Sequence, residues 1–235
     1  MKKLNILCTA SLLALASQQA LAADLTIEVQ NLTQGMYFTP ILAAAHASDA
    51  YLFKTGEAAS FELQMMAEGG DTSGLQGIVT SVSGDIATVQ GEDGLTGPAT
   101  SKTFSVTNAE ANTQLSVVAM ILPTNDGFIG LNGWTIPTDA GTYTVYLNAY
   151  DAGTEANDEL RGSGVPGAAG MPVPPPLDPV QGTGGSGVAG ADNNATVHIH
   201  RGNIGDDSAT DGASDVTNSV HRWLNPVAKI TVTVN

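Results

Sequence analysis

Three acidic residues of this chain stand in loop-like segments where they could bind a metal ion. Asp126 lies in the segment Leu122–Gly130, and Asp151 and Glu155 lie in the segment Ala149–Glu159. Each segment follows a predicted strand, so the acids would emerge at one end of a sheet. Calcium takes hard oxygen ligands from carboxylates, carbonyls and water, and flexible loops supply them well. The pattern therefore favours a calcium site, although Asp-Gly and Asp-Ala-Gly are also ordinary turn sequences.

His198 and His200 are a second group of possible metal ligands. They stand two residues apart on a predicted strand, so both side chains point to the same face. Two imidazoles can begin a zinc or copper site if further ligands arrive from elsewhere, and His46 and His221 are the only other histidines. Such a site would make the chain a periplasmic metalloenzyme. The alternative is that His198 and His200 hydrogen-bond neighbouring loops.

Other catalytic patterns are missing from the sequence. There is no Gly-x-Ser-x-Gly nucleophile elbow, and the single cysteine, Cys8, lies in the N-terminal leader described below. The glycines of 182–190 are not followed by the lysine and helix of a phosphate-binding loop. We therefore expect a protein that is not an enzyme.

The elements that must position these residues are mostly short strands. Alternating apolar and polar residues predict half-buried strands at both ends, Leu25–Gln30 and Ile230–Val234. The run 115–122 is apolar almost throughout, as in a central strand covered on both faces. Further strands are predicted at 78–82, 86–89, 103–106, 142–149 and 196–200. About eight strands favour an all-β, antiparallel β-sandwich.

Two segments favour helix and one favours loop. Glu57–Glu68 has an acidic first turn and apolar residues at helical spacing, and Gly69-Gly70 would end it. A second short helix or turn is predicted from Asp215 to Leu224, before Asn225-Pro226. The stretch Arg161–Asp192 holds 9 Gly and 6 Pro, which predicts a long mobile loop that builds no core. We place this loop inside one domain, residues 23–235.

The first 22 residues have the pattern of a cleavable export signal. Lys2 and Lys3 precede an apolar run that is too short to span a membrane, and Ala20-Leu21-Ala22 ends it. Removing both lysines takes the net charge from −15 to −17. This charge argues against nucleic-acid binding and against electrostatic binding to an anionic membrane. We expect an exported protein, periplasmic or extracellular.

Seven motifs, in order along residues 23–235, are similar to those of the spondin N-terminal domain in its stand-alone bacterial form. They are Asn31–Gly35, Gly56–Ser60, Ala67–Asp71, Pro123–Gly130, Tyr150–Glu155, Val197–Gly202 and Asn225–Ile230. The resemblance implies a C2-like β-sandwich with one or two short helical insertions. It also implies one calcium ion at the loop end, held by Asp126, Asp151 and Glu155. Animal relatives often have Asp where this chain has Glu155, and their disulfides cannot form here.

The function expected from these observations is a calcium-binding, non-catalytic module. In animal relatives the domain serves matrix attachment and cell adhesion, so we expect adhesion to a matrix protein, a surface or a glycan, or a role in cell-envelope assembly. Phe128, Ile129 and Trp134 follow the acidic loop, where they could contact a membrane or glycan or fill the end of the sandwich. The metalloenzyme with zinc or copper at His198 and His200 is the alternative.

Overall fold

The computed structural model describes residues 23–235 except 83, 90–93, 110 and 190–193, so the predicted signal segment 1–22 lies outside the described residues. Its main sheet follows the order β4-β3-β6-β7-β8-β12-β1-β5, with β2 beside β6 and β11 beside β8. All pairings in this sheet are antiparallel. The strands of the path are β1 Leu25–Asn31, β3 Ile41–His46, β4 Asp85–Val89, β5 Ser101–Val106, β6 Gln114–Leu122, β7 Gly127–Thr135, β8 Gly141–Asp151 and β12 Ala228–Val234, and the two short additions are β2 Tyr37–Phe38 and β11 His198–Ile199.

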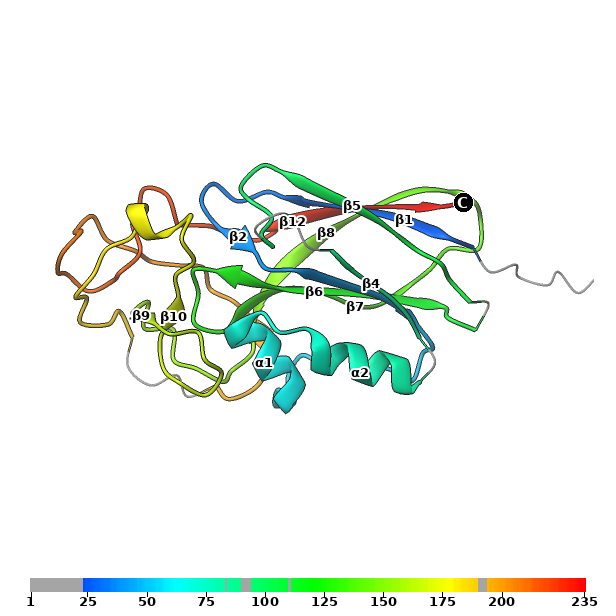
Figure 1. Ribbon diagram of the computed structural model, residues 1–235, viewed down its shortest axis with the longest axis horizontal. Coiled ribbons are helices and arrows are strands. Elements are labelled where there is room, and N and C mark those ends of the chain that lie inside the picture. The colour runs from blue at the N-terminus through cyan, green and yellow to red at the C-terminus, as the bar shows by residue number, and fades with distance from the viewer. Residues whose placement is uncertain (1–22, 83, 90–93, 110, 190–193) are drawn as a thin grey trace, which may run out of the picture.

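The sheet folds into two layers with helices on one side (Figure 1). One layer holds β5, β1 and β12, and the other holds β7, β6, β3 and β4. Helices α1 Phe61–Gly69 and α2 Ser73–Ser81 cover the outer face of the second layer. The end strands β4 and β5 lie beside each other, so the sheet nearly closes on itself. The expected all-β antiparallel sandwich with two short helices is thereby confirmed.

Strand β8 connects the two layers. Its first part, Gly141–Leu147, pairs with β12, and its last part, Asn148–Asp151, pairs with Gly127–Gly130 of β7. The strand thus leaves one layer and enters the other near Leu147. Beyond Gly130, β7 is no longer paired with β8, so the two strands diverge there.

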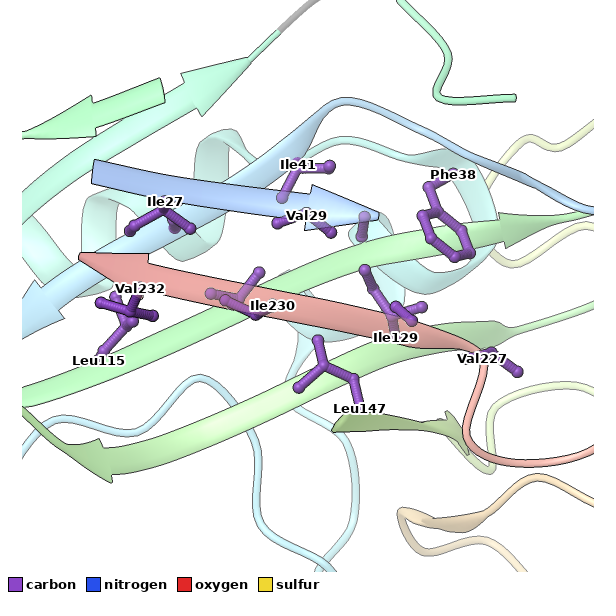
Figure 2. Close-up of a cluster of buried hydrophobic side chains, with 14 of the residues drawn as sticks. Ile27, Val29, Phe38, Ile41, Leu115, Ile129, Leu147, Val227, Ile230 and Val232 are labelled. Carbon is purple, nitrogen blue, oxygen red and sulfur yellow. The ribbon is translucent and has the colours of Figure 1, made fainter. Parts of the chain in front are cut away.

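Alternating side chains build the core between the layers. Every second side chain of β1 and β12 is fully buried. These side chains include Leu25, Ile27 and Val29 of β1 and Ile230 and Val232 of β12. Figure 2 shows four of them meeting side chains of the opposite layer, among them Ile41, Leu115 and Ile129. The four are Ile27, Val29, Ile230 and Val232. Burying one such side chain is worth roughly 1.5–3 kcal/mol. The period-two pattern of the sequence therefore places one face of each terminal strand in this core.

A second core lies between the second layer and the helices. Leu63 and Met66 of α1 and Leu75 and Val79 of α2 pack on side chains such as Val118 of β6. Strand β6 is therefore buried on both faces, as its continuous apolar run predicts. The helix α1 starts later than expected, because the Ser60 hydroxyl accepts the N–H of Leu63 and caps it.

The strand predicted at 78–82 is wrong. Residues 78–81 form the end of helix α2, and residue 82 lies in the turn after it. The β-branched residues Ile78 and Val79 favour a strand locally. Leu75 and Val79, however, are buried in the second core while Gly77 between them is exposed, which fits the period of a helix and not the two-residue period of a strand. Packing against the sheet therefore overrides the local preference.

Of the short helix or turn predicted at 215–224, the structure has a turn and no helix. The only helix-like contacts there are one turn in which Val220 N and His221 N donate to the Thr217 carbonyl. The other predicted strands are confirmed within β1, β4, β5, β6, β8 and β12, while 196–200 shortens to β11. Strands β3 and β7 were not expected, since Ala-rich and Gly-rich runs lack strand propensity.

The glycine- and proline-rich segment 161–189 contributes to the core, contrary to expectation. Leu177 is buried in the second core, and Met171 is fully buried as well. The segment contains the short parallel pair β9 Arg161–Gly162 and β10 Met171–Pro172 and a 3-10 turn at Asp178–Val180. Its backbone is held at several points, for example by the bond from Gly182 N to the Asp215 carbonyl (2.8 Å).

Phe128 and Ile129 are buried on opposite faces of β7, so within the described residues they fill the sandwich and are not exposed. In the described part of the chain, no helix combines the length and the apolar character that crossing a membrane requires.

Candidate metal centre

The pairing of β7 with β8 brings two of the predicted ligands together. Gly127 lies opposite Asp151 in the ladder, and Asp126 directly precedes Gly127. Thr124 shapes the turn that presents Asp126: its hydroxyl donates to the Ile121 carbonyl (2.6 Å) and accepts the N–H of Gly127 (3.0 Å). Asp126 and Asp151 therefore share one end of the second layer, as the sequence predicts.

Asp126 is fully buried, and its two carboxylate oxygens have different surroundings. Oδ2 accepts the N–H groups of Thr154 (2.7 Å) and Glu155 (3.1 Å) and the Thr154 hydroxyl (3.2 Å). Oδ1 is buried without any hydrogen-bond partner among the described residues. One oxygen thus holds the loop after β8 in place, and the other accepts no hydrogen bond from a described residue.

Asp151 organises the same loop from the end of β8. Its Oδ1 accepts the N–H of Gly153 (2.8 Å) and its Oδ2 accepts the side-chain amide of Asn157 (2.5 Å). Gly153 has a φ of +72°, and a Cβ atom there would lie 2.7 Å from the backbone nitrogen of Thr196. This turn therefore needs glycine at position 153.

Glu155 lies on the segment that Asp126 holds. The Asn125 side chain and the Gly170 backbone hydrogen-bond to it, and its Oε2 is buried without a partner among the described residues. Beside it is a pocket of about 260 Å³, lined by residues of the loop 154–158 and of the segment 167–170. The glycine- and proline-rich segment therefore forms one wall of the site.

Burial and like charge make ionised carboxylates costly here. Desolvation, followed by repulsion from Asp151, raises the pKa of Asp126 from 3.8 to about 7. Desolvation also raises the pKa of Glu155 from 4.5 to about 7, and repulsion from Glu68 and Asp126 adds to it. Asp126 is thus close enough to both Asp151 and Glu155 for like-charge repulsion, and a cation would relieve that repulsion.

The residues present fit a calcium ion better than a metal held by side chains alone. Among the described residues, no group of three or more His, Cys, Asp and Glu side chains is arranged as a metal cage. Calcium, however, completes its shell with carbonyl oxygens and water. One buried carboxylate oxygen on Asp126 and one on Glu155 lack a partner in the described part of the chain, and both are suitable hard donors.

Sequence reasoning missed four residues around these acids. Asn125 and Asn157 hold the two loops, and Glu68 and Gly170 approach Glu155 from distant segments. The two asparagines are next to the acidic motifs, so their position in the sequence was a usable signal. Glu68 and Gly170 carry no such signal, because only the tertiary fold brings them here.

The structure separates the roles of the two predicted histidines. His198 Nδ1 donates to the Thr196 carbonyl (2.7 Å), and its Nε2 lies 3.6 Å from Asp151 Oδ2. His200 is buried, accepts the N–H of Gly202 on Nδ1 (2.9 Å) and packs its ring on Trp223. His198 therefore borders the acidic site, whereas His200 is part of the packing next to it.

The other two histidines lie in separate surroundings. His46 Nε2 contacts the Ser116 hydroxyl (2.7 Å), and His221 contacts Thr217. Arg201, another residue of the Val197–Gly202 motif, donates to the carbonyl of Asn157 (2.7 Å). The motif thus supports the loop after β8 through Arg201 as well as through His198.

The family model for the spondin N-terminal domain (Spondin_N) matches residues 30–162, which is more than half of the 235 residues. The chain belongs to this family. The match includes Asp126, Asp151 and Glu155 and ends before His198 and His200. A comparison with curated proteins finds no match.

Spondin N-terminal domains are extracellular modules of the adhesion type, and their family is not known for enzymes. Membership supports the same class for this chain and agrees with the export predicted from residues 1–22.

Proposed function

We propose that the chain is an exported adhesion module that binds one calcium ion through Asp126, Asp151 and Glu155 and has no catalytic role. The observation that carries this proposal is a pair of buried carboxylate oxygens, Asp126 Oδ1 and Glu155 Oε2, that have no hydrogen-bond partner among the described residues. Asp126 is also repelled by Asp151 and repels Glu155. A bound Ca²⁺ supplies positive charge to this site. Backbone carbonyls and water would complete its ligands.

The ion would act mainly on the loops. Asp126 and Asp151 already accept hydrogen bonds from the segment 153–157, so neutralising their charge stabilises the turn that they organise. The same neutralisation reaches Glu155, next to the wall formed by residues 167–170. Calcium would therefore order the loop end as a surface for a matrix protein, a glycan or a cell-envelope component.

The competing function is a periplasmic metalloenzyme with zinc or copper at His198 and His200. One contact favours a metal near His198: because Nδ1 carries the proton donated to Thr196, a neutral ring directs the Nε2 lone pair toward Asp151. A zinc or copper ion needs further ligands, however, and His46 and His221 contact other groups. We therefore favour calcium.

The test is thermal unfolding of the purified chain in EDTA and then with calcium, magnesium or zinc. A ligand that binds only the native state at 100 times its Kd adds about 2.7 kcal/mol, which raises the Tm measurably. We expect a calcium-specific rise that is absent in the double variant Asp126→Asn/Asp151→Asn. Asp139→Asn is the matched control, because Asp139 is an exposed acid in the turn before β8.

Two outcomes would reject the calcium proposal. One is a Tm that calcium leaves unchanged in the parent chain. The other is a rise only with zinc that His198→Ala removes, which would establish the metalloenzyme alternative instead.

A further inference from the structure

The divergence of β7 and β8 leaves a pocket on the outer surface of the molecule. β8 pairs with β7 only up to Gly130, and its earlier residues pair with β12. The space between the strands is a pocket of about 290 Å³, which we call the β7–β8 pocket. Its side-chain lining comes mainly from Phe53, Thr55, Asn132, Tyr146, Asn148 and Tyr150.

A row of three side chains on β8 forms one side of this pocket. Tyr146, Asn148 and Tyr150 alternate with the buried Leu147 and Ala149, so all three point to the outer face. Tyr146 is 62% exposed and Asn148 is exposed as well. An exposed tyrosine ring offers an apolar face together with a hydroxyl group.

The second tyrosine of this row, Tyr150, is held in place by neighbouring aromatic rings. Its ring packs on Phe53 and Phe128, with ring centroids 4.9 and 5.7 Å away. Gly130 makes this packing possible, because a Cβ atom there would lie 2.7 Å from Phe53 and 2.8 Å from Tyr150. Tyr150 is therefore fixed before any ligand arrives, which lowers the entropy cost of binding.

The polar groups of the pocket are neutral. Asn132 Oδ1 accepts the N–H of Leu52 (3.2 Å), which leaves its amide protons for a ligand. Asn148 makes no side-chain hydrogen bond to another described residue, and Thr55 is exposed. No charged side chain is among the described residues that line the pocket, so it offers no charged partner to an anion or to a cation.

We propose that the β7–β8 pocket binds a neutral saccharide. Tyrosine faces pack on the C–H surface of a pyranose ring, while amide and hydroxyl groups exchange hydrogen bonds with its hydroxyls. The proposal names a glycan as the ligand of the adhesion module proposed above and rests on that function. The pocket does not include the calcium-site acids, although Tyr150 directly precedes Asp151.

Binding is tested with the purified chain in calcium against soluble cello-, laminari-, manno- and chito-oligosaccharides, with polygalacturonate and an extended hydrophobic peptide as comparisons. We expect at least one neutral oligosaccharide to bind with a Kd below about 1 mM. Tyr146→Ala should weaken it at least about tenfold, and Asn148→Ala should weaken it severalfold. Phe61→Ala, which removes an aromatic ring that is 69% exposed outside the pocket, should have no effect.

Three results would overturn the proposal: no neutral oligosaccharide binding at this concentration, binding that Tyr146→Ala leaves unchanged, or binding of the peptide or the acidic sugar alone. The Tm of each variant in calcium shows whether weaker binding comes from a change in the pocket or from unfolding of the variant. Saccharide binding without any rise of the Tm in calcium would reject the calcium site and support the saccharide pocket. A rise of the Tm in calcium without saccharide binding would support the calcium site and reject the saccharide pocket.

Discussion

Asp126 shows how one buried side chain can serve structure and ligand binding together. Its Oδ2 satisfies two backbone N–H groups of the loop after β8, and its Oδ1 has no partner among the described residues. Ionising a buried carboxylate costs free energy when one of its oxygens has neither a hydrogen bond nor a cation to compensate the charge. A cation bound to this oxygen would compensate the charge and so remove that cost.

The pKa values of Asp126 and Glu155 predict how stability without metal depends on pH. Both are raised to about 7 in the folded chain, above their ordinary values of 3.8 and 4.5. Between pH 4 and 7 the folded state therefore holds more protons than the unfolded state, so stability falls as pH rises and levels off above about 7. For Asp126 the loss is on the order of 4 kcal/mol, at about 1.4 kcal/mol for each pH unit.

Urea unfolding in EDTA at several pH values measures this slope. Asp126→Asn should flatten it, because an amide does not ionise, whereas Asp139→Asn should leave it unchanged. In calcium the slope should weaken or reverse, since the ion binds the deprotonated acids. A parent chain whose stability in EDTA is constant from pH 5 to 7 would contradict the raised pKa values.

At the scale of elements, the end of α1 supports the wall of the candidate site. Glu68 is buried in the last turn of the helix, where Oε1 accepts the Gln64 amide (2.9 Å) and Oε2 accepts the N–H of Gly167 (2.5 Å). The helix is itself fixed by Leu63 and Met66 in the second core. The glycine- and proline-rich segment thus takes its position from a helix that is remote in sequence.

We predict that Glu68→Ala loosens this segment. The N–H of Gly167 and the Gln64 amide lose their acceptor, and leaving such groups unpaired costs about 1–3 kcal/mol. Hydrogen exchange of residues 164–171 should accelerate, while exchange in β1 and β12 stays slow. Glu62→Ala, in the first turn of the same helix, is the control. Equal exchange rates of residues 164–171 in the two variants would show that Glu68 does not hold the segment.

At the scale of the whole molecule, the nearly closed sheet and its two cores link the chain ends to the loop end. β12 pairs with β1 and β8, and β8 continues to Asp151 at the candidate site. A ligand that binds only this folded arrangement stabilises every part that unfolds together with its site. Calcium should therefore offset part of the stability lost through a core substitution far from its own site.

Ile230→Ala tests this linkage. Ile230 is fully buried between the layers, so we expect a loss of about 2–5 kcal/mol in the free energy of unfolding. Calcium at 100 times its Kd should restore about 2.7 kcal/mol of this loss. Thr231→Ala, on the outer face of the same strand, should cost much less. If calcium stabilised the parent chain but left Ile230→Ala unchanged, the loop end and the sandwich would not unfold as one unit.

Much of the fold and part of the candidate site could be predicted from the sequence. Period-two alternation is a local signal, so β1 and β12 and their buried faces followed from it, and the apolar run of β6 indicated cover on both sides. Asp126, Asp151 and Glu155 followed from acids placed after strands together with the family motifs. Their carboxylate chemistry, together with the family motifs, is the basis for expecting a hard cation.

Only the tertiary structure decided the remaining features, because they depend on contacts between distant segments. Packing on β3 and β4 made α2 a helix where Ile78 and Val79 favour a strand. The fold also brought Glu68 and Gly170 to Glu155 and left Asp126 Oδ1 buried without a described partner. The change of layer by β8 opened the β7–β8 pocket. Propensity and periodicity act within a few residues, whereas burial and electrostatic repulsion depend on which segments meet in space.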